Sequence, residues 1–208
     1  MLTEPAAAGI GVAADAPRFA VDLQASEVRL LLYRGGPLAR FGHNHVIIGR
    51  VQGEIRSGES AAGSAFRLDI PVDTFLIDPP AARAEEGADF ADQVSEQARQ
   101  GTRENMLGEE VLDAARHPMI HIASVALAGP RWNPTVTARV TLRGAERDLR
   151  FPAAVFQSGD VLEVIAGFRV RQSDFGIKPF AVLGGGLLVR DEIDIRLRVV
   201  ARLSTKGG

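Results

Sequence analysis

The four histidines of this 208-residue chain lie in two short segments, and histidine is suited both to metal binding and to proton exchange near neutral pH. A single residue, Asn44, separates His43 from His45, so on a β-strand both imidazoles face the same side. Two imidazoles on one side can both bind the same metal ion. His117 and His121 fit together less well, because Pro118 disfavours helix at His117 and an extended chain separates the two by about 13 Å. A catalytic zinc ion needs three protein ligands. The spacing therefore allows a metal-dependent enzyme only if one histidine of the second segment meets the first pair across the fold.

Two simpler roles suit the same histidines. They can bond neighbouring polar groups at the rim of the fold, or His43 and His45 can contact the polar head of a bound amphiphile. Because the sequence shows no third ligand beside the pair, we expect no metal ion. We also predict no cofactor and no catalytic residue. A metal-dependent enzyme that uses a histidine cluster at the rim is kept as the alternative function.

Other motifs that supply chemistry are absent or out of context. The chain has no cysteine, which excludes disulfides, thiolate metal sites and cysteine nucleophiles. Residues 9–14 match a dinucleotide-binding glycine pattern, but no strand precedes them and no βαβ unit follows. The sequence has no phosphate-binding P-loop and no GxSxG nucleophile elbow. With 24 Lys and Arg against 26 Asp and Glu, the net charge of −2 argues against a nucleic-acid partner.

Alternating apolar and polar residues dominate the chain and predict β-strands with one buried face. The alternating segments are 19–23, 28–33, 46–55, 66–72, 120–127, 136–142, 149–155, 162–170 and 193–203. Short connections with turn residues, such as Gly129-Pro130, predict antiparallel pairing, and the length of several segments suits closure into a barrel. We therefore predict a mainly β fold, an eight-stranded antiparallel lipocalin-like barrel with a short helical insertion.

The alternation stops between residues 79 and 117, where apolar residues take helical spacing. The residues from Phe90 to Val94 indicate one short amphipathic helix, and those from Met106 to Leu112 indicate a second. Thr102 and Asn105 are the candidate N-caps of this second helix. The apolar faces of both helices must lie on another surface, and an open end of the barrel offers one.

An eight-stranded barrel encloses a space that side chains fill or that holds one small ligand. The inward runs are aliphatic or rich in phenylalanine, and the chain has a single Trp and a single Tyr, so we expect an open lumen. Strands of about ten residues give a lumen of about 25 Å, which suits an acyl or polyprenyl chain. The residues that we expect to contact this ligand are Phe41, His43, His45, Phe66, Leu68, Met106, Leu107, Phe168 and Phe175. Of these, His43 and His45 are the candidates for the polar end.

Four segments together resemble the YceI family of lipocalin-like, isoprenoid-binding proteins. They are Val72-Asp73-Thr74, the stretch from Met106 to Ser124, Leu142-Arg143-Gly144 with Arg147, and Ser173-Asp174-Phe175-Gly176-Ile177. The resemblance covers residues 18–203 and implies a barrel that holds a long amphiphile, such as a polyprenyl phosphate, a quinone or a fatty amide, with no established catalytic residues. Gln172 stands where the family usually has arginine, and Glu146 where threonine is common. We therefore expect the headgroup contacts to differ more than the fold.

These observations predict a flexible N-terminal segment 1–17, one YceI-like barrel domain 18–203 with the helical insertion 79–117, and a tail 204–208. The expected function is to bind and sequester or carry a long-chain amphiphile in the barrel. No apolar stretch approaches the roughly 20 residues that span a bilayer. We expect a cytoplasmic location for the sequence as it stands, and a periplasmic one if an N-terminal leader has been removed. A homodimer through an exposed strand or through the helices is compatible with the sequence.

Overall fold

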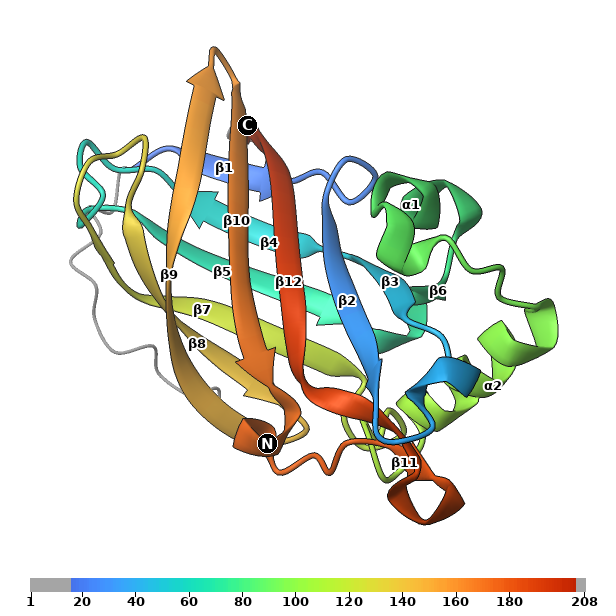
Figure 1. Cartoon of the computed structure of the whole chain (residues 1–208). Coiled ribbons are helices and arrows are strands. Elements are labelled where there is room, and N and C mark those ends of the chain that lie inside the picture. Colours follow the sequence, from blue (N-terminus) through green and yellow to red (C-terminus); the bar gives the residue numbers. More distant parts are fainter. Residues whose placement is uncertain (1–15, 205–208) are drawn as a thin grey trace.

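The computed structural model describes residues 16–204, so the expected flexible segment 1–17 and tail 204–208 lie largely outside the described residues. Figure 1 shows a twisted barrel with its helices gathered on one side. The strands are β1 (Arg18–Val21), β2 (Glu27–Gly35), β3 (His45–Arg50), β4 (Gln52–Arg56), β5 (Ala65–Pro71), β6 (Leu76–Ile77), β7 (Met119–Ala128), β8 (Thr135–Leu142), β9 (Ala145–Ser158), β10 (Val161–Arg171), β11 (Ala181–Val182) and β12 (Leu187–Leu203). The helices are α1 (Pro80–Glu85) and α2 (Glu96–Leu107), and short 3-10 turns are η1 (Ala39–Phe41), η2 (Val72–Thr74), η3 (Ala88–Phe90), η4 (Gln172–Phe175) and η5 (Leu183–Gly185).

Eight neighbouring strands close the barrel in the order β1-β4-β5-β7-β8-β9-β10-β12, and β1 pairs back onto β12. All of these pairings are antiparallel. The long strand β12 also pairs with β2. Outside the ring, β2 pairs with β3, and β3 pairs with β6. The predicted mainly β fold, an eight-stranded antiparallel barrel with a helical insertion, is confirmed.

The segment expected as one strand over residues 46–55 is divided into two. β3 pairs with β2 and β6, whereas β4 pairs with β1 and β5. Val51 lies between them and is fully buried. Gly53 has a φ of 137°, and a Cβ there would lie 2.1 Å from the carbonyl oxygen of Arg67. Only glycine lets β4 approach β5 this closely at this position.

The helical insertion contains two α-helices, but their boundaries differ from those expected. The first expected helix, from Phe90 to Val94, is not formed: α1 lies earlier in the chain, and Phe90 ends the 3-10 turn η3. Ser95 is the N-cap of α2, since its Oγ accepts a hydrogen bond from the N–H of Ala98 at 3.2 Å. The helix then runs through Gly101, a residue that costs about 1 kcal/mol in a helix interior, and Thr102. The prediction of Thr102 and Asn105 as N-caps was therefore wrong, because one glycine does not end a helix of this length.

The second expected helix also ends early. α2 stops at Leu107, and the next residue, Gly108, has extended backbone angles. The N–H of Leu112 donates to the carbonyl of Met106 at 3.1 Å, and the N–H of Asp113 to that of Gly108 at 2.8 Å. These bonds form turns between α2 and β7, so only Met106 and Leu107 of the expected stretch are helical.

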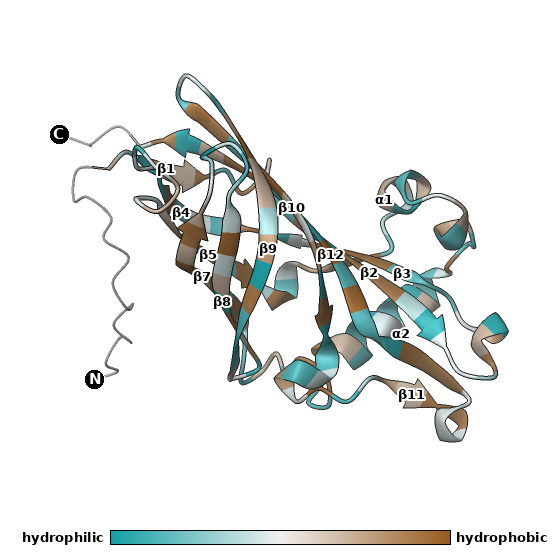
Figure 2. Ribbon diagram, turned by 60° about the vertical axis from the view of Figure 1, so that its left-hand side comes forward, coloured by the Kyte–Doolittle hydropathy of each residue, from teal (hydrophilic) through white to brown (hydrophobic). Residues whose placement is uncertain are grey.

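The hydrophobic core lies inside the barrel, and alternate residues of strands such as β8 and β12 are buried. Figure 2 shows this alternation as brown and teal bands along the strands. The inward residues of β12 are Ile193, Ile195, Leu197 and Val199. Because successive side chains of a strand point to opposite faces, the sequence period places each of them inside the barrel.

Candidate functional site

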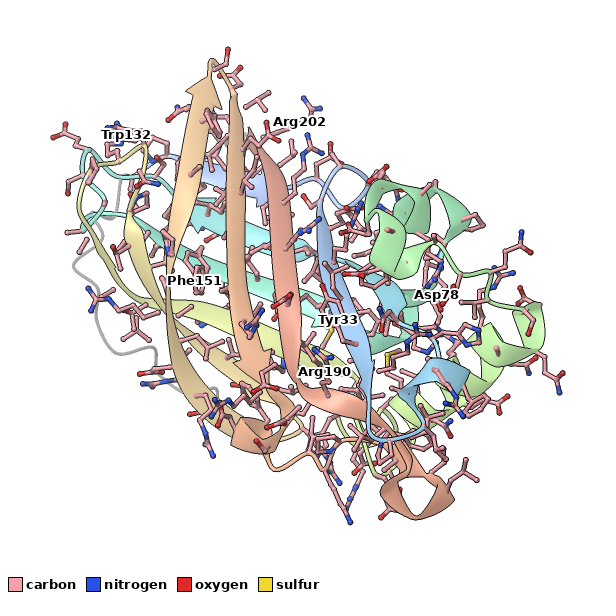
Figure 3. The ribbon with its side chains drawn as sticks, viewed as in Figure 1. Tyr33, Asp78, Trp132, Phe151, Arg190 and Arg202 are labelled. Atoms are coloured by element: carbon pink, nitrogen blue, oxygen red, sulfur yellow. The ribbon has the colours of Figure 1, made fainter. Side chains whose placement is uncertain are left out.

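Two cavities lie in the described part of the chain, one toward each end of the molecule. The Trp132 cavity, of about 320 Å³, is lined by inward residues of strands from β4 to β12 and by the connections at its mouth. The His45 cavity, of about 260 Å³, lies among β2, β3, α2 and the hairpin formed by β11 and the start of β12. Trp132 and this hairpin lie at opposite ends of the molecule (Figures 1 and 3). The first volume falls within the range of small-molecule pockets, roughly 300–1,000 Å³.

Apolar side chains form most of the wall of the Trp132 cavity. Members of this wall include Phe66, Leu68, Ile122, Val136, Leu197 and Val199. Phe151 of β9 and Phe168 of β10 add a flat aromatic surface, with ring centroids 4.2 Å apart and 14° between the ring planes. Such a surface gives dispersion contacts and offers few hydrogen-bond partners, so it suits an apolar ligand.

Polar groups from two connections and from the end of β9 meet at the mouth of the Trp132 cavity. Nη2 of Arg131 donates to Oγ of Ser57 at 3.2 Å and to Oε1 of Gln157 at 3.4 Å. Trp132, the next residue, is 70% exposed. Both acceptors are neutral, and a negatively charged oxygen binds a guanidinium more strongly than they do. The mouth can therefore hold an anionic or strongly polar head while the interior holds an apolar chain.

The His45 cavity has a more polar wall. His43 and His45 share it with Phe41 and Met106, and the two imidazole centroids are 6.5 Å apart. Nδ1 of His45 lies 2.6 Å from Oδ2 of Asp78. An ionised carboxylate can only accept a hydrogen bond, so Nδ1 of His45 is the donor. The other ring nitrogen, Nε2, takes no part in this bond.

Asp78 is completely buried beneath the His45 cavity. Its Oδ1 accepts hydrogen bonds from the N–H of Val46 at 2.9 Å and from Nη1 of Arg83 at 2.6 Å. Burial by itself raises the pKa of Asp78, but the hydrogen bonds from His45, Val46 and Arg83 outweigh it and lower the pKa below its ordinary value. Nη1 of Arg83 also donates to the carbonyl of Asn44 at 2.7 Å. The carboxylate thus ties α1 to β3.

The other two histidines line neither cavity. Nδ1 of His121 lies 2.6 Å from Oδ1 of Asp69, and the His121 side chain is 56% exposed. The ring of His117 lies beside Gly144, where an added Cβ would be 3.2 Å from Cε1. Among residues 16–204, no three His, Cys, Asp or Glu side chains come together as a metal site. The alternative based on a histidine cluster therefore has no third ligand in this part of the chain.

A layer of apolar side chains separates the two cavities. This separating layer consists of Leu30, Val170, Ile193 and Ile195. Ile193 pairs in register with Leu32, which lines the His45 cavity, and Ile195 pairs with Phe168, which lines the Trp132 cavity. On β12 itself, Val189 of the His45 cavity and Leu197 of the Trp132 cavity are eight positions apart, which is about 26 Å of extended chain.

The nine expected ligand contacts do not share one cavity. Phe66, Leu68 and Phe168 line the Trp132 cavity, whereas Phe41, His43, His45 and Met106 line the His45 cavity. Leu107 and Phe175 line neither: Leu107 packs against the core, and Phe175 is buried in it. The interior is not the single open lumen that strand length suggests, because the separating layer divides it.

Sequence reasoning missed the mouth of the Trp132 cavity. Its signal is the single tryptophan beside Arg131, directly after the turn Gly129-Pro130 and between two strands. A large exposed aromatic residue next to a cation at a strand connection suits the entrance of an apolar site. Phe151 was also missed, although the alternation of residues 149–155 places it on the inward face.

A closed antiparallel barrel, a helical insertion and an apolar cavity with a polar mouth define a lipocalin-like barrel. The model of the YceI-like domain matches residues 19–201, and the chain therefore belongs to this family, as its sequence motifs predicted.

Solved structures share the fold at low sequence identity. Burkholderia cenocepacia BcnA is 19% identical with a TM-score of 0.60, over 87% of this chain and 99% of that one. A polyisoprenoid binding domain from Saccharophagus degradans, implicated in plant cell wall breakdown, is 10% identical with a TM-score of 0.62, over 91% and 100%. The Campylobacter jejuni YceI protein is 12% identical with a TM-score of 0.54, over 74% and 82%.

A comparison with curated proteins and the lengths of the helices both give negative findings. No curated protein matches this sequence. Within residues 16–204, neither helix has the length and apolar character needed to cross a membrane.

Proposed function

We propose that this protein binds a long-chain amphiphile of the isoprenoid type and sequesters or carries it without turnover. The apolar tail occupies the Trp132 cavity, and the polar head lies at the mouth beside Arg131. The observation that carries this proposal is the apolar cavity of about 320 Å³, open at a mouth with a cationic rim. Membership of the YceI-like family and the fold shared with a polyisoprenoid binding domain support the ligand class.

The physical driving force is burial of the apolar tail. Removing about 400 Å² of apolar surface from water contributes up to about 10 kcal/mol, from which the cost of association is subtracted. The stacked rings of Phe151 and Phe168 would contact the tail on one side, and Leu68 and Leu197 are in the same wall. An apolar wall of this kind selects a chain by its shape and size and leaves the choice of head to the mouth.

The head is the more specific part of the ligand. Arg131 holds two neutral partners, Ser57 and Gln157, at 3.2 and 3.4 Å. A phosphate would replace these bonds with shorter charge-assisted ones, whereas a quinone or an amide would accept a single ordinary hydrogen bond. We therefore propose a polyprenyl phosphate as the preferred ligand over a quinone or a fatty amide.

The first test is native mass spectrometry of freshly purified protein, followed by solvent extraction and identification of the extract. We expect an excess mass of several hundred daltons that leaves with the solvent. An excess equal to one transition-metal ion, unaffected by solvent, would instead support the histidine-cluster enzyme. If the protein is bare, polyprenyl phosphate is added, and the absence of any mass shift would contradict the proposal.

A pair of variants tests the location of the tail. Ala153 faces the Trp132 cavity, while its neighbour Ala154 faces the other side of β9. We expect Ala153→Leu, which fills the cavity, to abolish binding of added polyprenyl phosphate, and Ala154→Leu to leave binding unchanged. Equal binding by both variants would place the tail elsewhere.

A further inference from the structure

An exposed apolar surface lies at the end of the molecule opposite Trp132. We call it the hairpin surface and define it by Phe41, Val182 and Leu183, which are 63%, 39% and 72% exposed. Figure 1 shows β11 and the start of β12 projecting from the barrel below α2, and Figure 2 shows brown segments in this hairpin. Clustered exposed apolar side chains on a folded protein mark an interaction site.

Two segments far apart in the sequence build the hairpin surface. The N–H of Leu38, in the β2–β3 connection, donates to the carbonyl of Gly186 at 2.8 Å. This bond holds the connection that carries Phe41 against the hairpin that carries Leu183. Phe41 and Val182 also line the His45 cavity, so the surface continues into the mouth of that cavity.

Leu183 has a conformation that the stability of the barrel does not explain. Its φ is 54°, a left-handed value that leucine rarely adopts, and its side chain is 72% exposed. Residues 184–186 are all glycine, so the tip of the hairpin is small apart from Leu183. The turn therefore presents one large apolar side chain to the surroundings, where an apolar medium would bury it.

The two segments that build the hairpin surface carry charged side chains of one sign. Residues 35–43 and 175–190 contain Arg40, Lys178 and Arg190 and no Asp or Glu, although the whole chain has a net charge of −2. All three basic residues are exposed, and the guanidinium of Arg40 lies 4.6 Å from the ring centroid of Phe41. Apolar side chains bordered by cations fit a surface that is apolar below and anionic above.

We propose that the hairpin surface docks this protein on a lipid bilayer that contains anionic headgroups. Leu183 and Phe41 would enter the apolar boundary, and Arg40, Lys178 and Arg190 would contact the headgroups. A second copy of the chain fits this surface less well, because two identical basic surfaces repel each other. The docking surface is separate from the Trp132 cavity and leaves that mouth facing the water.

The test is cosedimentation of the full chain with vesicles of phosphatidylcholine alone or mixed equally with phosphatidylglycerol. We expect binding to the mixed vesicles at about 0.1 M salt and its loss at about 1 M salt, where the Debye length falls from about 10 to about 3 Å.

Leu183→Asp should weaken binding at least about tenfold, since a carboxylate at the tip meets anionic headgroups. This variant keeps the fold, because aspartate tolerates the left-handed conformation. Arg40→Gln and Lys178→Gln should each weaken binding about fivefold.

The matched control is Phe156→Asp, which removes a 58% exposed apolar residue on the outside of β9. It should bind vesicles as the parent chain does. Fluorescence then gives the orientation. Trp132, the sole tryptophan, should keep its emission when vesicles are added, whereas Leu183→Trp in a Trp132→Phe background should shift to shorter wavelength.

Three outcomes would overturn the docking proposal. These are a vesicle-induced shift of Trp132 emission, equal loss of binding in Leu183→Asp and Phe156→Asp, and a dimer in sedimentation velocity that Leu183→Asp dissociates while no variant binds vesicles. None of them affects the ligand test, which depends on Ala153 and on added lipid in solution. Failure of docking and failure of the proposed function are therefore distinguishable.

Discussion

His45 and His121 each place Nδ1 2.6 Å from a carboxylate oxygen, but the two carboxylates differ in burial. The side chain of Asp78 is 0% exposed, whereas that of Asp69 is 26% exposed. A buried carboxylate that loses its charge leaves its partners unpaired in a medium of low dielectric, whereas water screens and replaces an exposed partner. Two histidine–carboxylate pairs with the same bond length therefore differ in what they contribute to the stability of the fold.

We predict that Asp78→Asn lowers the free energy of unfolding by about 3 kcal/mol near pH 7. Because the pKa of Asp78 is lower in the folded than in the unfolded chain, its charge stabilises the folded state above about pH 4, and this contribution disappears as the pH falls through the folded pKa. The difference between parent and variant should therefore shrink in acid. Urea unfolding at pH 7, 5 and 3 measures it.

Asp69→Asn is the matched control for this prediction, since it removes the carboxylate of the exposed pair. Its cost should stay below about 1 kcal/mol. Equal costs for the two variants, or a cost for Asp78→Asn that does not change with pH, would contradict the interpretation of Asp78 as an ionised buried anchor.

In the proposed function, the choice of head depends on Arg131. We predict that Arg131→Gln weakens binding of polyprenyl phosphate about tenfold or more, the equivalent of one charge-assisted hydrogen bond, and changes binding of the corresponding alcohol little. Arg139→Gln is the control, because Arg139 is paired with Asp148 outside the cavity, with Nε at 2.8 Å from Oδ1. Fluorescence titration of Trp132 reports both affinities. Equal weakening for phosphate and alcohol would mean that Arg131 acts on the shape of the mouth.

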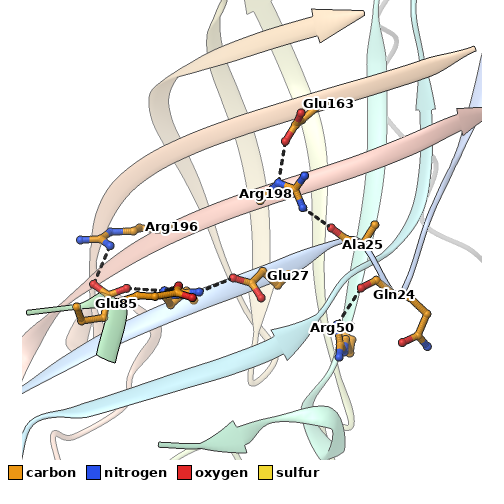
Figure 4. Close-up of polar contacts among 10 residues, drawn as sticks. Gln24, Ala25, Glu27, Arg50, Glu85, Glu163, Arg196 and Arg198 are labelled. Carbon is orange, nitrogen blue, oxygen red and sulfur yellow. Dashed lines mark hydrogen bonds and ion pairs between the residues drawn. The ribbon is translucent and has the colours of Figure 1, made fainter. Parts of the chain in front are cut away.

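At the scale of elements, the helical insertion is tied to the barrel by buried carboxylates. Asp78 precedes α1, and Glu86 follows it. The Glu86 side chain is 1% exposed and lies 2.7 Å from Nη1 of both Arg29 on β2 and Arg196 on β12. Figure 4 shows the polar contacts on this face of the barrel. Ion pairs of these two carboxylates thus hold both ends of α1, and residues 87–94 connect α1 to the N-cap of α2.

We predict that Glu86→Gln loosens α1 locally and leaves the barrel intact. The loss of two charge-assisted bonds costs about 1.5–3 kcal/mol, which corresponds to at least about tenfold faster amide exchange in residues 80–90. Glu85→Gln is the control, since that side chain is 63% exposed although it also pairs with Arg29. Hydrogen exchange detected by mass spectrometry separates the two. Faster exchange throughout β10 and β12 in Glu86→Gln would show that the insertion is not a separate unit.

At the scale of the whole molecule, the two ends differ, and the separating layer lies between their cavities. One end has an apolar cavity with Arg131 at its mouth, and the other has the histidines, α2 and the hairpin surface. In the proposed function, the position of the layer sets the length of tail that the Trp132 cavity accepts. The location of the protein in the cell and its oligomeric state stay predictions.

We predict that Ile195→Ala opens the separating layer and extends the range of tails toward longer chains. The variant should lose about 2–5 kcal/mol of stability, while the control Ile195→Val should lose about 1 kcal/mol and keep the chain-length preference of the parent. Native mass spectrometry with a mixture of polyprenyl phosphates gives the preference directly. An unchanged preference in Ile195→Ala would show that the tail does not reach the layer.

The sequence by itself determined the strands, their inward faces and the family, because alternation and turn residues are local properties of the chain. It also indicated His43 and His45 as neighbours on one side of the chain. Only the tertiary structure decided which inward residues face a cavity and which pack against each other, as Phe168 and Phe175 illustrate. It also decided the polar partners, such as Asp78 for His45 and Ser57 for Arg131. The reason is physical: a cavity depends on the summed volumes of side chains from strands far apart in sequence, and a buried charge depends on partners that folding brings together.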